Sequence, residues 1–199
     1  YPSLHQCSLI MGFALRIGDW EGCERLLDHM KKEFTWFNQL KFVEANENLY
    51  NGTRAYFRRE YDKALTLYEK ALGIAVVPPN ILNTLYHMKA VDMWTEGKEN
   101  DALALTKKAL EINSDDPYGV FNLGIINWKL YKNHLEAGLS FVDDEKAREV
   151  WQKPLQEFIK QTKHIPQAKP AIDIAEAVLA DRYTGKKPPL LYPPEPKVQ

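Results

Sequence analysis

Histidine, which often binds a metal or acts as a base, occurs only singly along this sequence. The histidines are His5, His29, His87, His134 and His164. None is followed four residues later by a second histidine or a cysteine, so no single helix face presents two metal ligands. His134-Leu-Glu136 has the H-x-E order of zinc deaminases, but no P-C-x-x-C motif follows it. Since G-x-S-x-G, Walker and G-x-G-x-x-G motifs are also missing, we expect no catalytic residue, no metal and no cofactor, and a chain that is not an enzyme.

The charge balance and the cysteine count argue against further classes of protein. The chain has 199 residues, with 26 lysines and arginines against 27 aspartates and glutamates, so its formal net charge is -1. A nucleic-acid binder usually carries a basic excess, and we therefore expect no nucleic-acid partner. No apolar run approaches the about 18 residues that a membrane helix needs, which predicts no membrane insertion. The two thiols, Cys7 and Cys23, form no C-x-x-C pair, and they favour a cytoplasmic over a periplasmic location without deciding it.

Three segments share one pattern of small and large residues. Each has a small residue, a larger residue four positions later and another core-type residue three positions after that. The sets are Ala64, Tyr68 and Ala71; Ala102, Thr106 and Ala109; and Cys23, Leu27 and Met30. Spacings of four and three place the members of each set on one face of a helix. The small residues then allow a neighbouring helix to approach closely.

A second helix precedes two of these segments at a constant distance. Gly52 lies 12 residues before Ala64, and Ala90 lies 12 residues before Ala102. Ala90 is also 34 residues from Gly124, which belongs to the next segment of this kind. The pattern predicts helix hairpins that are repeated along the chain.

These residues resemble the tetratricopeptide repeat, a helix–turn–helix of 34 residues with the pattern L-G-x2-Y, then A-x3-F-x2-A, then Pro. Residues 45–130 match this pattern well, and residues 4–34 match it loosely. The segments between repeats are longer than usual, because Cys23 and Ala64 are 41 residues apart and Ala64 and Ala102 are 38 apart. The resemblance implies an all-α fold, a right-handed α-α superhelix of helix hairpins.

The resemblance and the helix signals together predict the domain organisation. Residues 1–184 form the helical repeat domain, with units at about 4–34, 45–75, 83–113 and 117–163 and an insertion near 131–143. An extra helix at about 170–184 closes the domain, with Pro170 in its first turn and Gly185 at its C-terminal cap. Residues 185–199 form a proline-rich tail that we expect to be extended.

The first helices of the hairpins carry a face rich in aromatic residues. In the family, such positions line the concave groove and bind the ligand, so the resemblance implies a partner-binding site here. The residues are Thr53, Tyr56, Phe57, His87, Val91, Trp94, Tyr118, Phe121, Ile125 and Trp128. Each buried aromatic covers roughly 150–250 Å², so this face would exceed the roughly 300–600 Å² of a typical monomer's largest apolar patch. We therefore expect something to cover it.

Three occupants of this face remain open. A protein partner's helix or extended peptide would make the chain a non-enzymatic interaction scaffold or adaptor. A small apolar molecule would make it an accessory ligand-binding protein, for example a periplasmic partner of a transporter. The chain's own closing helix or its tail around Leu190 and Tyr192 would instead make the face part of the core. If the tail is displaceable, it could cover the face until a protein partner replaces it. A tail that enters a neighbouring molecule would cause self-association.

Overall fold

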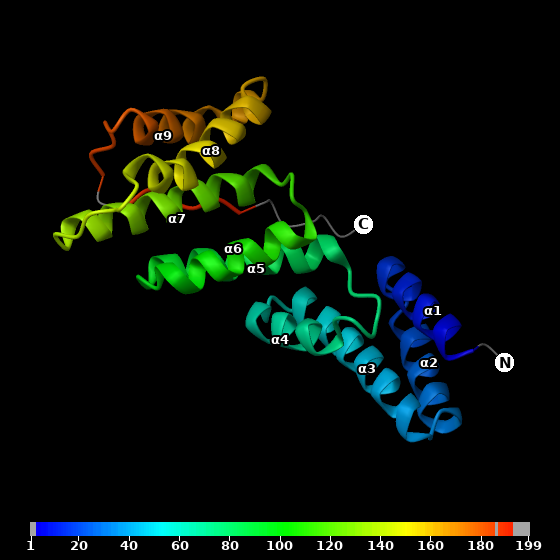
Figure 1. Cartoon of the computed structure of the whole chain (residues 1–199). Coiled ribbons are helices and arrows are strands. Elements are labelled where there is room, and N and C mark those ends of the chain that lie inside the picture. Colours follow the sequence, from blue (N-terminus) through cyan, green and yellow to red (C-terminus); the bar gives the residue numbers. More distant parts are fainter. Residues whose placement is uncertain (1–2, 186, 193–199) are drawn as a thin grey trace. The chain divides into compact units, whose positions relative to one another are not determined.

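A computed structural model describes residues 3–185 and 187–192. Nine α-helices and one 3-10 turn make up the regular structure in this part of the chain, and it contains no strand (Figure 1). The helices are α1 (Leu4–Ile17), α2 (Trp20–Glu33), α3 (Phe37–Phe57), α4 (Tyr61–Ala71), α5 (Pro79–Thr95), α6 (Glu99–Ile112), α7 (Pro117–Glu136), α8 (Asp144–Thr162) and α9 (Lys169–Leu179), with the turn η1 (Pro166–Ala168) before α9. The expected all-α architecture of helix hairpins is therefore confirmed.

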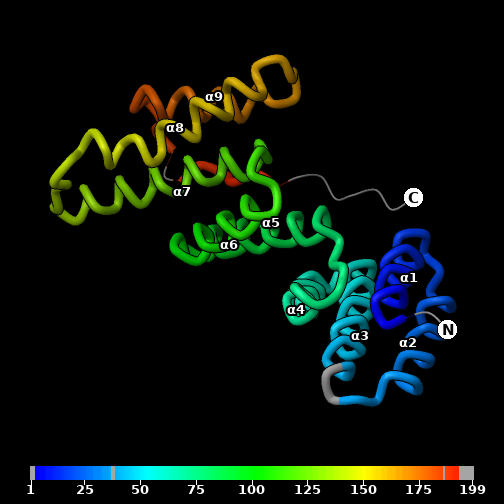
Figure 2. Tube along the Cα trace, turned by 45° about the vertical axis from the view of Figure 1, so that its right-hand side comes forward, coloured from blue at the N-terminus to red at the C-terminus, as the bar shows by residue number. Residues whose placement is uncertain are grey.

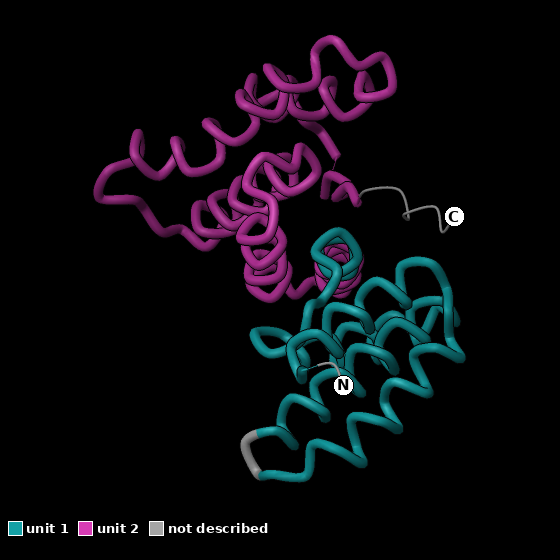
Figure 3. Tube along the Cα trace, turned by 90° about the vertical axis from the view of Figure 1, so that its right-hand side faces the viewer, with its two compact units in different colours: residues 1–85, 196–199 teal, residues 86–195 magenta. Residues whose placement is uncertain are grey.

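The chain divides into two compact units (Figure 3). The boundary lies between Leu85 and Tyr86, within α5. Helices α1 to α4 therefore belong to the first unit, and α6 to α9 belong to the second. Each unit has its own buried core.

In the first unit, α1 packs against α2, and both of these helices pack against α3 (Figure 2). Cys7 of α1, Met30 of α2 and Val43 of α3 form one buried cluster. A buried hydrogen bond joins α1 to α3, because the Ser8 hydroxyl donates to Asn46 Oδ1 over 3.0 Å. Cys7 is a free thiol, so it contributes to this core as a small apolar side chain.

The small residues of the repeat pattern account for the pairing of α3 with α4. A Cβ added to Gly52 of α3 would lie 3.0 Å from the ring of Tyr68 on α4. Ala64 and Ala71, on the same face as Tyr68, are fully buried. The Tyr68 hydroxyl donates to Thr53 Oγ1 over 3.0 Å, and burial raises the pKa of Tyr68 to about 12. The two helices thus approach so closely that a Cβ at the facing position would be in tighter than ordinary van der Waals contact.

The second unit is built around α7. The side chains of Phe121, Ile125 and Ile126 on this helix are fully buried. Phe121 packs on Phe158 of α8, with ring centroids 4.9 Å apart. Leu155 of α8 lies over Gly124, where an added Cβ would be 2.6 Å from two of its side-chain carbons. Gly124 therefore allows the close approach of α7 and α8, as Gly52 allows that of α3 and α4.

Helix α7 extends through the first part of the predicted insertion. It ends at Glu136, and Ala137 to Asp143 connect it to α8. The extension is held by Tyr131, whose ring stacks on Phe141 at 5.0 Å and whose hydroxyl donates to Asp144 over 2.7 Å. Of the predicted insertion, residues 131–136 thus belong to α7, and residues 137–143 connect α7 to α8.

The closing helix α9 is shorter than the predicted 170–184. It presents Ile172, Ala175 and Val178 to the core and ends at Leu179. The chain turns there because Asp181 adopts a positive φ of 53°, and the N–H of the following residue bonds back to Ala177 O over 2.8 Å. The helix therefore stops before Gly185, which sequence analysis placed at its C-terminal cap.

Candidate functional site

The aromatic face in the second unit is occupied by the C-terminal segment, which we define as residues 187–192. The segment has neither helix nor strand and runs along α7 (Figure 2). Leu190 is 6% exposed and belongs to the same core cluster as Trp94, Phe121 and Ile125. The chain's own tail thus covers part of the surface that we expected to be covered.

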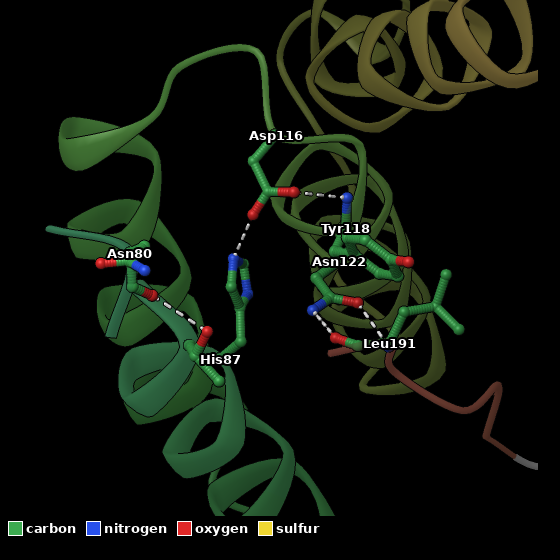
Figure 4. A network of polar contacts seen from close by, with 7 residues as sticks. Asn80, His87, Asp116, Tyr118, Asn122 and Leu191 are labelled. Atoms are coloured by element: carbon green, nitrogen blue, oxygen red, sulfur yellow. Dashed lines mark hydrogen bonds and ion pairs between the residues drawn. The ribbon is translucent and has the colours of Figure 1, made fainter. Parts of the chain in front are cut away.

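Asn122 of α7 holds the main chain of this segment. Its Oδ1 accepts the N–H of Leu191 over 2.7 Å, and its Nδ2 donates to the carbonyl of the same residue over 2.5 Å (Figure 4). Asn122 is fully buried, so its amide would lose both hydrogen bonds without an occupant in this position. One side chain therefore recognises both polar groups of one residue in an extended chain.

Trp94 of α5 holds the segment at a second point. Its indole Nε1 donates to the carbonyl of Pro188 over 2.9 Å, and its side chain is 3% exposed. The ammonium of Lys187 lies 4.0 Å from the centroid of the same ring and also donates to the main-chain oxygen of Trp94. Glu99, at the start of α6, pairs with this ammonium over 3.1 Å. Trp94 and Glu99 together form a site for a cation.

The electrostatics of Glu99 agree with this geometry. Burial by itself raises the pKa of the carboxyl group. The backbone N–H at the start of α6 and the nearby ammonium of Lys187 outweigh that effect, and the pKa of Glu99 is lowered. The carboxylate is therefore charged at neutral pH and attracts the cation.

A buried pair fixes α5 beside the start of α7. His87 Nε2 lies 2.6 Å from Asp116 Oδ2, and the histidine is fully buried (Figure 4). Asp116 also caps α7, because its Oδ1 accepts the N–H of Tyr118 over 3.2 Å. This pair holds the helix that carries Trp94 near the helix that carries Asn122.

The predicted site residues divide between the two units. Those in the second unit are His87, Val91, Trp94, Tyr118, Phe121, Ile125 and Trp128. Trp94 contacts the C-terminal segment directly, whereas His87 holds the helices together. Trp128 packs edge-on against Tyr183, with ring centroids 5.9 Å apart.

The other three predicted residues lie on α3 in the first unit. Thr53 and Tyr56 are buried, and Thr53 is bonded within its own unit as described above. Phe57 is 38% exposed and packs edge-on against Trp20 at 5.4 Å. It lines an open cavity of about 540 Å³ together with Arg16, Arg54 and Arg58 among others. These three residues thus belong to the first unit, whereas the C-terminal segment belongs to the second.

The polar members of the site, which were not predicted from the sequence, are Asn122, Glu99 and Lys187. Asn122 lies between apolar residues in the run Val120 to Ile126 of α7. A buried amide in such a helix needs a hydrogen-bond partner, and that requirement was the available signal. For Glu99 and Lys187 we find no comparable signal, because they are 88 residues apart in the sequence.

The described residues contain neither a metal-binding cluster nor a membrane-spanning helix. Over residues 3–185 and 187–192, no three His, Cys, Asp or Glu side chains are grouped so that they could hold a metal ion. In the same part of the chain, no helix has the length and apolar character needed to cross a membrane.

Two kinds of known protein are similar in sequence to about half of this chain. A TPR repeat-containing protein of Methanocaldococcus jannaschii is 30% identical over 111 residues, which are 54% of this chain and 18% of that protein. Photosystem I assembly protein Ycf3 of Prochlorococcus marinus is 33% identical over 104 residues in strain MIT 9303, which are 51% of this chain and 60% of that protein. In strain MIT 9211 it is 32% identical over 105 residues, again 51% and 60%. The chain therefore covers less than two thirds of each of these relatives. No protein-family model matches the chain, and no solved structure matches it significantly.

The helix hairpins with their closely packed small residues define a helical-repeat protein. Over about half of its length, the chain is similar to a tetratricopeptide-repeat protein, and its all-α hairpins agree with that likeness.

Proposed function

We propose that this chain is a non-enzymatic scaffold that binds a protein partner through an extended peptide laid along α7. The partner would contact the second-unit members of the predicted face, with Trp94 and Asn122 at its centre. An assembly role is supported by the relatives named as photosystem I assembly proteins, but the identity of the assembled partner does not transfer from them.

The single observation that carries the proposal is the pairing of Asn122 with Leu191. Both hydrogen bonds go to main-chain atoms, which every peptide has. Within an α-helix, the N–H and carbonyl groups are already hydrogen-bonded to residues four positions away. A partner helix could therefore not form both hydrogen bonds with the Asn122 amide. The site therefore favours an extended peptide over a partner helix.

The test uses a full chain in which a protease recognition sequence is inserted between Thr184 and Gly185, both of which are exposed. The chain is cut after folding, and circular dichroism checks that the helices remain. A library of extended peptides is then screened against the cut chain by fluorescence anisotropy. We expect a selected peptide to lose roughly tenfold or more in affinity with Asn122→Ala, because two hydrogen bonds of about 1 kcal/mol each are lost.

Asn133→Ala is the matched control, because it makes the same change on the same helix away from the segment. It should leave the affinity unchanged. The proposal is contradicted if no peptide binds the cut and folded chain, or if the selected peptides bind the Asn122→Ala chain equally well.

A further inference from the structure

We infer that residues 187–191 are an internal copy of the partner's binding motif. The partner would then carry an extended peptide with a cationic residue, a proline directly after it and a leucine two positions after the proline. This inference rests on the proposed function, because it names the class of peptide that the same site takes.

The contacts of the segment separate into general and specific ones. Trp94 bonds the carbonyl of Pro188, and Asn122 bonds both polar groups of Leu191. On the segment's side, these three hydrogen bonds involve main-chain atoms only. They therefore select for an extended chain but not for a particular sequence. Specificity must come from the side chains that the face encloses, which are the half-buried Lys187 and the buried Pro188 and Leu190.

The position of Lys187 defines the cation preference. Its ammonium contacts three groups at once: the ring of Trp94, the main-chain oxygen of that residue and the carboxylate of Glu99. The side chain of Glu99 is only 18% exposed, so a face without a cation would leave a largely buried carboxylate unpaired. An acidic or neutral residue at this position of the peptide is therefore disfavoured.

The position of Leu190 defines the apolar preference. The side chain is 6% exposed within the core cluster, Leu191 is partly buried against the same cluster, and Tyr192 is 52% exposed. Pro189, on the other side, is exposed as well. A peptide that copies positions 187, 188 and 190 would thus reproduce the enclosed contacts, whereas positions 189 and 192 are free to vary.

The short connection to α9 makes the segment a competitor of the partner. Helix α9 ends at Leu179, so fewer than ten residues separate the core of the unit from Lys187. A short tether gives the tail an effective concentration on the order of millimolar, so that a free peptide must compete with it. Weakening the tail without removing it should therefore raise the affinity for the peptide.

The test measures binding of a fluorescent synthetic peptide of residues 185–192 to the intact chain. In the chain, Lys187→Glu places a carboxylate against Glu99 and weakens the tail. We expect the native-sequence peptide to bind this variant about tenfold or more tightly than it binds the wild-type chain. Lys146→Glu is the control. It reverses the charge at an exposed position of α8 and should leave the affinity at the wild-type level.

Changes in the peptide test the motif on the Lys187→Glu chain. Lys187→Glu and Leu190→Asp in the peptide should each reduce binding about tenfold or more, whereas Tyr192→Ala should not. The inference is overturned if the peptide binds both chains with equal affinity, if its altered versions bind as well as the native sequence, or if light scattering shows a dimer that Lys187→Glu dissociates. In each of these cases, peptides selected on the cut chain through Asn122 would still support the proposed function.

Discussion

Replacing Gly124 by alanine should lower the free energy of unfolding by about 1–2 kcal/mol, although alanine is the better helix former. The added Cβ would lie 2.6 Å from two side-chain carbons of Leu155 and 3.3 Å from its backbone nitrogen. A side chain can rotate away, but the backbone of α8 cannot move without disturbing the second unit's core. Overpacking of this kind costs about 1–3 kcal/mol, and more in the tightest sites, against a gain of about 1 kcal/mol in helix propensity. Urea denaturation followed by circular dichroism measures the balance.

Gly12 in α1 is the matched control. An added Cβ there meets nothing closer than Val76 at 3.9 Å, which is ordinary van der Waals contact. Gly12→Ala should therefore stabilise the chain by up to about 1 kcal/mol through helix propensity alone. A Gly124→Ala variant as stable as the wild type would show that α7 and α8 do not approach as described.

Replacing Asp116 by alanine should destabilise the chain by about 3 kcal/mol, since this side chain has two separate structural roles. It caps α7 by accepting the N–H of Tyr118, and loss of such a cap costs about 1 kcal/mol. It also pairs with the fully buried His87 at 2.6 Å, and a buried polar group left without its partner costs about 1–3 kcal/mol more. Chemical denaturation again provides the measurement.

Asp143→Ala separates these two contributions. Asp143 caps α8 by accepting the N–H of Lys146 over 2.9 Å, and it is exposed with no buried histidine beside it. Its loss should cost only about 1 kcal/mol. Equal destabilisation by the two substitutions would mean that the His87–Asp116 pair contributes nothing to stability.

The repeat spacing predicted the helices because it reports local packing. Glycine and alanine at 12-residue separations mark the positions where helices touch, and Gly52 and Gly124 lie at such contacts in the structure. The end of α9 was predicted too late, because it depends on Asp181 adopting a left-handed conformation that is more typical of glycine or asparagine. The boundaries between repeats, and the ten-residue binding face as a whole, stay predictions.

The interaction between the tail and α7 could not be derived from helix periodicity. A helix pattern shows which residues share a face, but not which distant segment covers it. Asn122 and Leu191 are 69 residues apart, and neither position is distinctive on its own. From the sequence, the tail is therefore one of three expected occupants of the face.

The predicted aromatic residues are poor probes of binding because they are buried. Trp94 and Trp128 are 3% and 6% exposed and belong to the core cluster of the second unit. Substituting either by alanine would cost about 3–5 kcal/mol of stability and would confuse unfolding with loss of binding. Asn122 is the better probe, because alanine in its place removes two hydrogen bonds and little apolar volume.

Hydrogen exchange at the Leu191 amide tests most directly the claim that this face of α7 holds an extended main chain. Nuclear magnetic resonance follows this N–H in the intact chain and in the Asn122→Ala variant, with Asn133→Ala as the control. The account predicts exchange at least about tenfold slower in the wild type and in the control than in Asn122→Ala, because only Asn122 accepts this hydrogen bond. Exchange of the Leu191 amide at one and the same rate in the wild type and in Asn122→Ala would contradict it.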